Sequence, residues 1–482
     1  MTSRNDFAGH PATAIERVGA VRLGRQRSPS TATGDYMTKY IRAGNITDRG
    51  LDLSDVFKMN FEPQERQIYG LRNNDILLVE GSGSAQHVGK SAIWRDEIEE
   101  CCFQNTVIRF RAHAVDARYA LIVFRHYVAS GVFAQTARGI GILHLGAARF
   151  ANLSFPLPPS EDQINIVAVV DERTSEIRET REALESALTR IAEQEKEILS
   201  QMANGTLPIT TAPQKDDNSQ EDSRNITNKE RGAPLIQQAL PTEGGETSVY
   251  PWAGVLPDGW HWVQMSDIAD IKIGRSRSPK NSQGSNMRPY LRVANVLEDR
   301  LDLSTITYMN FTEEEFAQYR LEPDDVLLND GQSPELVGRP AIYRGDPPGV
   351  CYQNHIIRFR PGPDVDPEFA VLVFRHYLHA GHFRAIARWT TNIATLSLKR
   401  FSAMPFPLPD IRQQRQLASE ARYRLDSSDE QRRMVIDSLK RLPLLEEEIL
   451  FQAVRGALRW SQVWGLGGVC GVSVQSGRLC GR

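Results

Sequence analysis

At 482 residues the chain is long enough for about two to four domains, and its 40% apolar and 24% charged residues are typical of globular proteins. No apolar run approaches the roughly 20 residues of a membrane span, and the N-terminal stretch lacks the apolar core of a secretory signal. A net charge of −3 excludes a protein that is basic throughout, and five scattered cysteines without metal-type spacing favour a reducing cytoplasm.

The sequence contains a long internal repeat, whose two copies are offset by about 250 residues. GRQRSP at 24–29 returns as GRSRSP at 274–279, QNTVIRFR at 104–111 as QNHIIRFR at 353–360, and FPLP at 155–158 as the same letters at 406–409. This offset is too long for a solenoid repeat and fits two whole domains. We therefore predict two homologous globular repeats, at residues 1–158 and 251–408.

GSGSAQHVGKSAIW at 81–94 resembles a phosphate-binding loop, which needs Gly, four residues, and then Gly-Lys-Ser/Thr. Ser84 stands where the first glycine should be, and the second copy, DGQSPELVGRPAIY, has Arg339-Pro340 in place of Lys90-Ser91. A loop that lost both residues could not keep that chemistry. The pattern predicts a glycine turn before a strand, with a cation that is either solvated or in contact with nucleic acid.

A long helix is predicted after each globular repeat, at 159–206 and 409–458, because apolar residues recur there at three-, four- and seven-residue spacing. Ser160 is typical of an N-cap, and Gln163 would complete a capping box. Pro443 is expected to bend or break the second helix. The two apolar stripes favour pairing of the helices as an antiparallel coiled coil, and packing of each on its own domain is the alternative.

These elements indicate the α/β class, in its α+β form, with two tandem domains that are each followed by a long helix. Residues 207–250 are polar and rich in Pro, Gly and charge, so they are expected to form a flexible linker. Residues 459–482 have no counterpart after the first helix and no periodicity, so a disordered tail is expected there.

Positive charge gathers at matching places of the two repeats. Residues 21–50 hold six Arg or Lys against two acids, and residues 271–300 hold seven against two. Such clusters neutralise phosphates, and Arg and amide side chains can read base edges, although each amide is equally compatible with a turn hydrogen bond. The predicted DNA-binding residues are Arg25, Arg27, Ser28, Arg42, Asn45, Lys90, Gln104, Asn105 and Arg138, and then Arg275, Arg277, Ser278, Arg292, Asn295, Arg339, Gln353, Asn354, Arg388, Thr391 and Asn392. Trp389, beside the last of these, is interpreted as a packing aromatic.

Signals of catalysis are weak. No histidine pair has metal-ligand spacing, and no Gly-x-Ser-x-Gly elbow is present. The segment 346–349, Asp-Pro-Pro-Gly, lacks the aromatic residue that an amino-methyltransferase tetrad needs. We expect no catalytic residue, no metal and no cofactor in this chain.

The repeat pattern, LPDGWHWVQMSDIADIKIG at 256–274, the two FPLP entries into helices and the helix end ILSQMANG resemble the specificity subunit of type I restriction–modification systems. The resemblance covers residues 10–456. It implies a non-catalytic cytoplasmic reader of double-stranded DNA, whose two target-recognition domains contact a split target. It further implies helices that fix the gap and dock two methyltransferase subunits carrying S-adenosylmethionine. Restriction/translocase subunits would use ATP and Mg²⁺, and no membrane partner is implied.

Two other functions are compatible with the residues: a stand-alone DNA-binding regulator with the same domains, and a self-contained nuclease–methyltransferase. If the helices pack antiparallel, a pseudo-twofold axis relates the repeats, and we expect an interrupted, near-palindromic target. We also expect that replacing Arg25 with Arg27, or Arg275 with Arg277, by Ala weakens one half-site.

Overall fold

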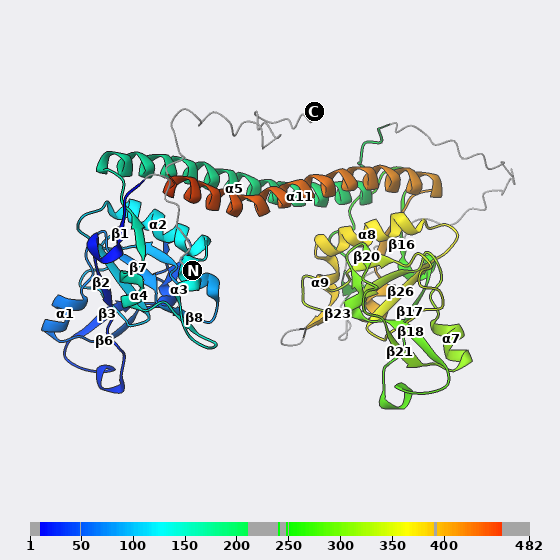
Figure 1. Ribbon diagram of the computed structural model, residues 1–482. Coiled ribbons are helices and arrows are strands. Elements are labelled where there is room, and N and C mark those ends of the chain that lie inside the picture. The colour runs from blue at the N-terminus through cyan, green and yellow to red at the C-terminus, as the bar shows by residue number, and fades with distance from the viewer. Residues whose placement is uncertain are drawn as a thin grey trace, which may run out of the picture. The chain divides into compact units, whose positions relative to one another are not determined.

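The structure, a computed structural model, describes residues 10–48, 50–210, 240–241, 247–248, 250–389 and 393–455. The chain divides into two units: the first holds residues up to 185 together with those from 436 onward, and the second holds residues 186–435. We call residues 10–158 the first lobe and residues 250–409 the second lobe. Each unit thus contains one lobe and parts of both long helices (Figure 1).

A four-stranded antiparallel sheet forms the centre of the first lobe. Its strands, in spatial order, are β2 (Gly19–Leu23), β11 (Val107–Ala112), β7 (Ile76–Val79) and β9 (Ser91–Ile93). A second sheet consists of β10 (Cys102–Phe103), β3 (Met37–Ile41) and β6 (Phe57–Asn60), with β10 parallel to β3. Shorter strand pairs are β1 (Ala12–Ala14) with β13 (Ser154–Pro156), β4 (Ile46–Thr47) with β5 (Gly50–Leu51), and β8 (Gly81–Ser82) with β12 (Leu143–His144). The helices are α1 (Pro63–Tyr69), α2 (Ala117–Ala129), α3 (Val132–Thr136) and α4 (Ala147–Ala151).

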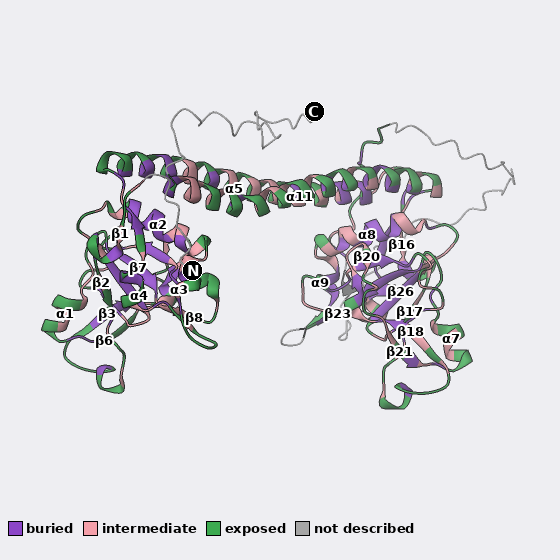
Figure 2. Cartoon of the chain, in the orientation of Figure 1, coloured by how far each residue is buried: buried purple, intermediate pink, exposed green. Residues whose placement is uncertain are grey.

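The central strand β7 is apolar without a break because both of its faces are covered. Alternate side chains of a strand point to opposite faces. Ile76 and Leu78 pack in the cluster that includes α2, whereas Leu77 and Val79 pack with the second sheet. Buried residues accordingly gather along the strands and on α2 (Figure 2).

The second lobe repeats this arrangement. Its four-stranded sheet is β17 (Ala269–Ile273), β26 (Ile356–Pro361), β22 (Val326–Asn329) and β24 (Pro340–Ile342). Its three-stranded sheet is β21 (Thr307–Asn310), β18 (Met287–Leu291) and β25 (Cys351–Tyr352). The shorter strands are β16 (His261–Gln264) with β29 (Pro405–Leu408), β19 (Val296–Leu297) with β20 (Arg300–Leu301), and β23 (Gly331–Gln332) with β28 (Ala394–Thr395) and β27 (Arg388–Trp389). The helices are α6 (Met265–Ile268), α7 (Glu313–Tyr319), α8 (Pro367–His379), α9 (His382–Ile386) and α10 (Leu398–Ser402), and β14 (Leu240–Pro241) pairs with β15 (Thr247–Ser248).

The two long helices are α5 (Ser160–Ala203) and α11 (Ile411–Val454). The capping box predicted for α5 is wrong, because Ser160 is already helical and Gln163 bonds to the lobe instead. The buried Gln163 carboxamide accepts from the Asp116 N–H at 2.9 Å and donates to the Pro158 carbonyl at 2.8 Å. Gln414 makes the matching bonds in α11, so one glutamine fastens each lobe to the start of its helix.

Pro443 does not break α11, which is one continuous helix through that position. The proline lacks the N–H for one backbone bond and is exposed, so water can reach the carbonyl that this bond would have satisfied. Its neighbour Leu442 is 4% exposed and contributes packing on the other side of the helix. The predicted break is therefore wrong.

In each unit the two helices are in contact through an ion pair. Arg181 of α5 bonds Glu446 of α11 at 3.1 Å in the first unit, and Arg432 of α11 bonds Glu195 of α5 in the second. Both arginines stand 21 residues after the first residue of their helix, and both glutamates stand 35 residues after it. The same pair of positions is therefore used once in each unit.

Part of the predicted linker is packed. Leu207 is 4% exposed, and the Thr210 hydroxyl donates to the Glu420 carboxylate of α11 at 2.8 Å. Residues 207–210 therefore belong to the second unit. Most of the predicted linker, residues 211–239 and parts of 242–249, and the predicted tail, residues 459–482, lie outside the described residues.

Candidate nucleic-acid interface

The repeated GR-x-R-S-P segment follows the edge strand β2 and lies against the end of β10. The Arg25 N–H donates to the Phe103 carbonyl, and the Asn105 N–H donates to the Arg25 carbonyl at 3.0 Å. Gly24 permits this approach, because a Cβ there would lie 2.1 Å from the Gln104 carbonyl oxygen. The second lobe builds the same edge from Gly274, where a Cβ would lie 2.2 Å from the Tyr352 carbonyl oxygen. We call this edge the arginine edge of each lobe.

Arg25 holds the arginine edge together from inside. Its guanidinium bonds Glu65 of α1 at 2.6 Å, donates to the Asn60 carbonyl at 3.0 Å and lies over the Phe61 ring. Its side chain is 17% exposed. Arg275 has the equivalent partners, Glu315, the Asn310 carbonyl and Phe311. These two arginines brace the edge from inside, and their contact with DNA stays a prediction.

Arg27 and Arg277, two residues further on, are exposed. Ser28 and Ser278 are half-buried and precede short 3₁₀ turns. In the second lobe an open depression of about 620 Å³ lies at this place. It is lined by Lys272, Gly274, Arg275, Ser276, Ser278, Asn281, Gln318, Tyr319 and Leu398, among others. The arginine edge therefore combines exposed cations with hydroxyl and amide groups.

The matched amides divide into two groups. Gln104 and Asn105 are half-buried at the arginine edge, as are Gln353 and Asn354. Asn45 and Asn295 are 3% and 1% exposed, and each binds backbone groups of its own loop. The Asn45 amide donates to the Asp52 and Asp55 carbonyls, and the Asn295 amide to those of Asp302 and Thr305. The turn interpretation holds for this pair, which has no amide edge left for a base.

Arg42 and Arg292, next to these asparagines, are half-buried as well. The Arg42 guanidinium bonds Asp55 at 2.6 Å and lies 4.1 Å from the centre of the Phe57 ring. Arg292 donates to the Thr305 carbonyl at 3.4 Å. Both brace the loop that Asn45 or Asn295 closes, so they are weak candidates for DNA contact.

Lys90 and Arg339 directly follow the glycine of the predicted turn. Lys90 bonds Asp48 at 2.8 Å, and its side chain is 15% exposed. Burial lowers the pKa of Arg339, although the charge of Glu298 opposes this. The preceding Gly89 and Gly338 have φ of 77° and 82°, and a Cβ there would lie 2.1 and 2.3 Å from the rings of Phe133 and Phe383. The glycines are required for the turn, and Lys90 pairs with the exposed carboxylate of Asp48 at the lobe surface.

The segment before each long helix forms a hairpin. Arg138 is exposed and donates to the Gln135 and Ala137 carbonyls at the end of α3. Arg388 is exposed at the matching place, whereas Thr391 and Asn392 lie outside the described residues. Trp389 is 52% exposed, with Arg384 5.5 Å from its ring centre, so it is not a core aromatic and packs against its own loop.

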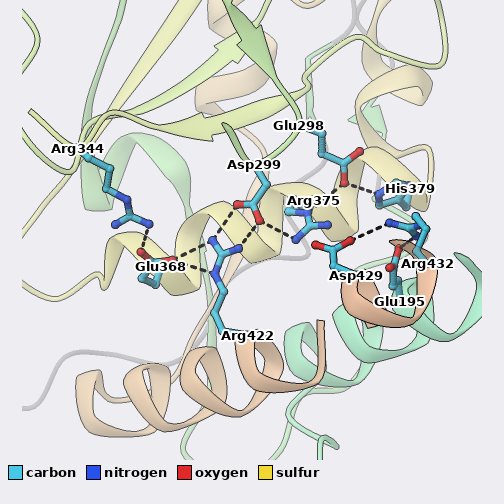
Figure 3. A network of polar contacts seen from close by, with 10 residues as sticks. All are labelled: Glu195, Glu298, Asp299, Arg344, Glu368, Arg375, His379, Arg422, Asp429 and Arg432. Atoms are coloured by element: carbon cyan, nitrogen blue, oxygen red, sulfur yellow. Dashed lines mark hydrogen bonds and ion pairs between the residues drawn. The ribbon is translucent and has the colours of Figure 1, made fainter. Parts of the chain in front are cut away.

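A network of charges joins the second lobe to α11 (Figure 3). Arg422 of α11 bonds Asp299 and also Glu368 of α8, and Arg375 of α8 bonds Asp299 and Glu298 at 3.0 Å. Burial raises the pKa of Glu298, but His379 and Arg375 outweigh it and lower this pKa to about 2. The carboxylate therefore stays charged at neutral pH.

The first lobe has the same contact with its charges reversed. Arg118 of α2 is the counterpart of Glu368, and Asp171 of α5 is the counterpart of Arg422, each at the same position of its helix. Arg118 and Asp171 form an ion pair whose side chains are half exposed. In each lobe an ion pair therefore joins α2 or α8 to the long helix, with the cation on the lobe in the first case and on the long helix in the second.

Comparison with known proteins addresses what this architecture is used for. Residues 257–420 match the family model described as the type I restriction modification DNA specificity domain. A Methanocaldococcus jannaschii protein named as a type I restriction enzyme specificity subunit is 25% identical over 167 residues, which are 34% of this chain and 39% of that protein. The EcoKI specificity subunit of Escherichia coli K12 is 21% identical over 462 residues, 93% of this chain and 88% of that one. Residues 257–420 thus carry a type I restriction–modification DNA specificity domain, and the chain as a whole is similar to specificity subunits.

The fold agrees with this similarity. A chain from a solved type I restriction–modification system superimposes with a TM-score of 0.64 at 17% identity, over 93% of this chain and 98% of that one. The matched residues lie in the second lobe and at the start of α11, and they include the arginine edge and the hairpin of that lobe. Within the described residues no helix has an apolar stretch long enough to cross a membrane, and no cluster of His, Cys, Asp or Glu could hold a metal.

Sequence reasoning missed Gln318. It enters the depression from α7, more than 35 residues beyond the other lining residues of the arginine edge. Its own neighbourhood in the sequence, EEEFAQYR, carries no DNA-binding signal. Only the packing of α7 beside β25 brings this amide to the edge.

Proposed function

We propose that this specificity subunit is a non-catalytic DNA reader whose two lobes contact the two halves of a split target. The observation that carries the proposal is the arginine edge, built in both lobes from the same backbone contacts and presenting Arg27 in one lobe and Arg277 in the other. An exposed arginine beside hydroxyl and amide groups suits phosphate contacts and the reading of bases.

The long helices would set the distance between the half-sites. The repeated ion pair, Arg181 with Glu446 and Arg432 with Glu195, supports an antiparallel coiled coil with a pseudo-twofold axis. Two similar lobes related in this way would read similar half-sites on opposite strands. We therefore propose an interrupted, near-palindromic target.

The same helices would dock two methyltransferase subunits, and restriction/translocase subunits would join the complex in the cytoplasm. S-adenosylmethionine would belong to the methyltransferases, and ATP and Mg²⁺ to the translocase. The stand-alone regulator is not favoured, because the similar proteins are restriction specificity subunits. If the chain is isolated from its own cells and no methyltransferase co-purifies with it, the stand-alone regulator would be favoured instead.

The proposal predicts a defined effect of Arg27→Ala and Arg277→Ala. Each change should weaken binding to duplex DNA about 3- to 10-fold and lower the slope of log affinity against log salt by about one, because one phosphate contact is lost. The measurement is equilibrium binding at several salt concentrations, with the full chain bound to its methyltransferase partner.

Arg17→Ala is the matched control. Arg17 is also exposed, but it lies before β2 whereas Arg27 follows that strand, so it is not part of the arginine edge. Its replacement should leave affinity and salt slope unchanged. Equal behaviour of Arg27→Ala, Arg277→Ala and Arg17→Ala at every salt concentration would remove the arginine edge from the interface.

A further inference from the structure

The hairpin of the first lobe carries an apolar tip that no other part of the lobe covers. Its two ends are joined by mutual backbone bonds between Arg138 and His144, and β12 pairs with β8. Ile140 is fully exposed at 104%, and Ile142 is 55% exposed. Leu145, directly after the hairpin, is 0% exposed and anchors it in the core.

Glycines fix the shape of this tip. Gly139 and Gly141 have φ of 143° and 80°, and a Cβ on Gly139 would lie 2.0 Å from the Ile142 carbonyl oxygen. An L side chain at either position would be strained. Glycine is therefore required at both positions for this turn, in which Ile140 is exposed to solvent.

The second lobe also exposes a large apolar side chain on its hairpin, directly after Arg388. Trp389 of β27 is 52% exposed, and β27 is held by β28, whose Ala394 is completely buried. The guanidinium of Arg384 lies 5.5 Å from the Trp389 ring centre. Both hairpins also expose an isoleucine three residues before a buried leucine, Ile142 at 55% and Ile393 at 53%, and both present an apolar group next to arginine.

A single exposed apolar residue on a protein surface needs no explanation. Here two lobes place one on an anchored hairpin, beside Arg138 in the first and beside Arg384 and Arg388 in the second. Cations attract phosphates, and apolar side chains can enter a base step and unstack it. The combination suits a nucleic-acid duplex better than a protein surface.

We propose that the hairpins are wedges: Ile140 and Trp389 each enter a base step of one half-site, while the neighbouring arginines hold the phosphates. This inference rests on the proposed function, because it requires that the lobes bind DNA. The apolar side chains of the hairpins would then contribute affinity that does not depend on salt, and the arginines would contribute the salt-dependent part.

The test uses the full chain and a duplex that is methylated in cells carrying this chain and its methyltransferase partner. Ile140→Ala and Trp389→Ala should each weaken binding fivefold or more with an unchanged salt slope, because no charge is removed. Thymines of the half-site should react with permanganate in the wild-type complex, since unstacked thymines are accessible, and this reactivity should disappear in the variants.

Val255→Ala is the matched control, because Val255 is an aliphatic residue that is 101% exposed and lies outside the hairpins. It should change neither affinity nor reactivity. Wild-type affinity and reactivity in Ile140→Ala and Trp389→Ala would overturn the wedge. Loss of methyltransferase co-purification with intact DNA binding would also overturn it, by assigning the hairpins to a protein partner. Failure of the wild-type chain to bind any duplex would contradict the proposed function itself.

Discussion

Gly24→Ala is expected to destabilise the first lobe by about 3 kcal/mol or more and to abolish its DNA contact. The new Cβ would lie 2.1 Å from the Gln104 carbonyl oxygen and 2.3 Å from the carbonyl carbon. Both atoms belong to the backbone, which cannot rotate away as a side chain would. Relief requires that the segment after β2 separate from β10, which displaces Arg25, Gln104 and Asn105 together.

Hydrogen exchange of the peptide around residues 100–107 measures this separation directly. Exchange should become much faster in Gly24→Ala than in the wild type. Gly83→Ala is the control, since the nearest atom to its new Cβ is 3.9 Å away and its φ is not in the left-handed region. If both variants exchange like the wild type, the close approach is not needed for the arginine edge.

Arg422→Ala is expected to loosen the second lobe from α11. The change removes one of the two arginines that pair with each of the partly buried carboxylates Asp299 and Glu368, and leaves only Arg375 and Arg344 beside them. Breaking a buried ion pair by removing one partner costs about 3–5 kcal/mol, and partial exposure of these side chains reduces this to about 2–3 kcal/mol. The unfolding midpoint of the second unit in urea should fall accordingly.

Asp171→Ala offers a control at the same helix position of the other repeat. Its ion pair with Arg118 is half exposed on both sides, so its loss should cost about 1 kcal/mol or less. A larger effect at Asp171 than at Arg422 would show that the network of Figure 3 does not hold the second lobe.

Much of the architecture could be predicted because the chain repeats itself. The repeat at an offset of about 250 residues predicted two similar lobes, and the apolar spacing predicted both long helices, which the structure places at Ser160–Ala203 and Ile411–Val454. The break expected at Pro443 was wrong, because sequence does not reveal that the proline lies on the exposed side of a helix packed through Leu442.

The site was harder to predict, since residues that look alike in the sequence have different structural roles. Arg25 and Arg27 are two residues apart and look equivalent in sequence, but Glu65, 40 residues later, binds the first and leaves the second exposed. Asn45 was compatible with base contact or with a turn hydrogen bond, and its amide closes a loop. Repetition marks these residues as important without separating structural from binding roles.

Mapping of methylated bases in DNA from cells that carry this chain and its methyltransferase partner tests the central claim most directly. The account predicts methylation in one interrupted motif, with two related half-sites in inverted orientation and a constant gap. Methylation within one continuous short motif, or a gap that varies from site to site, would contradict two lobes held at a fixed separation.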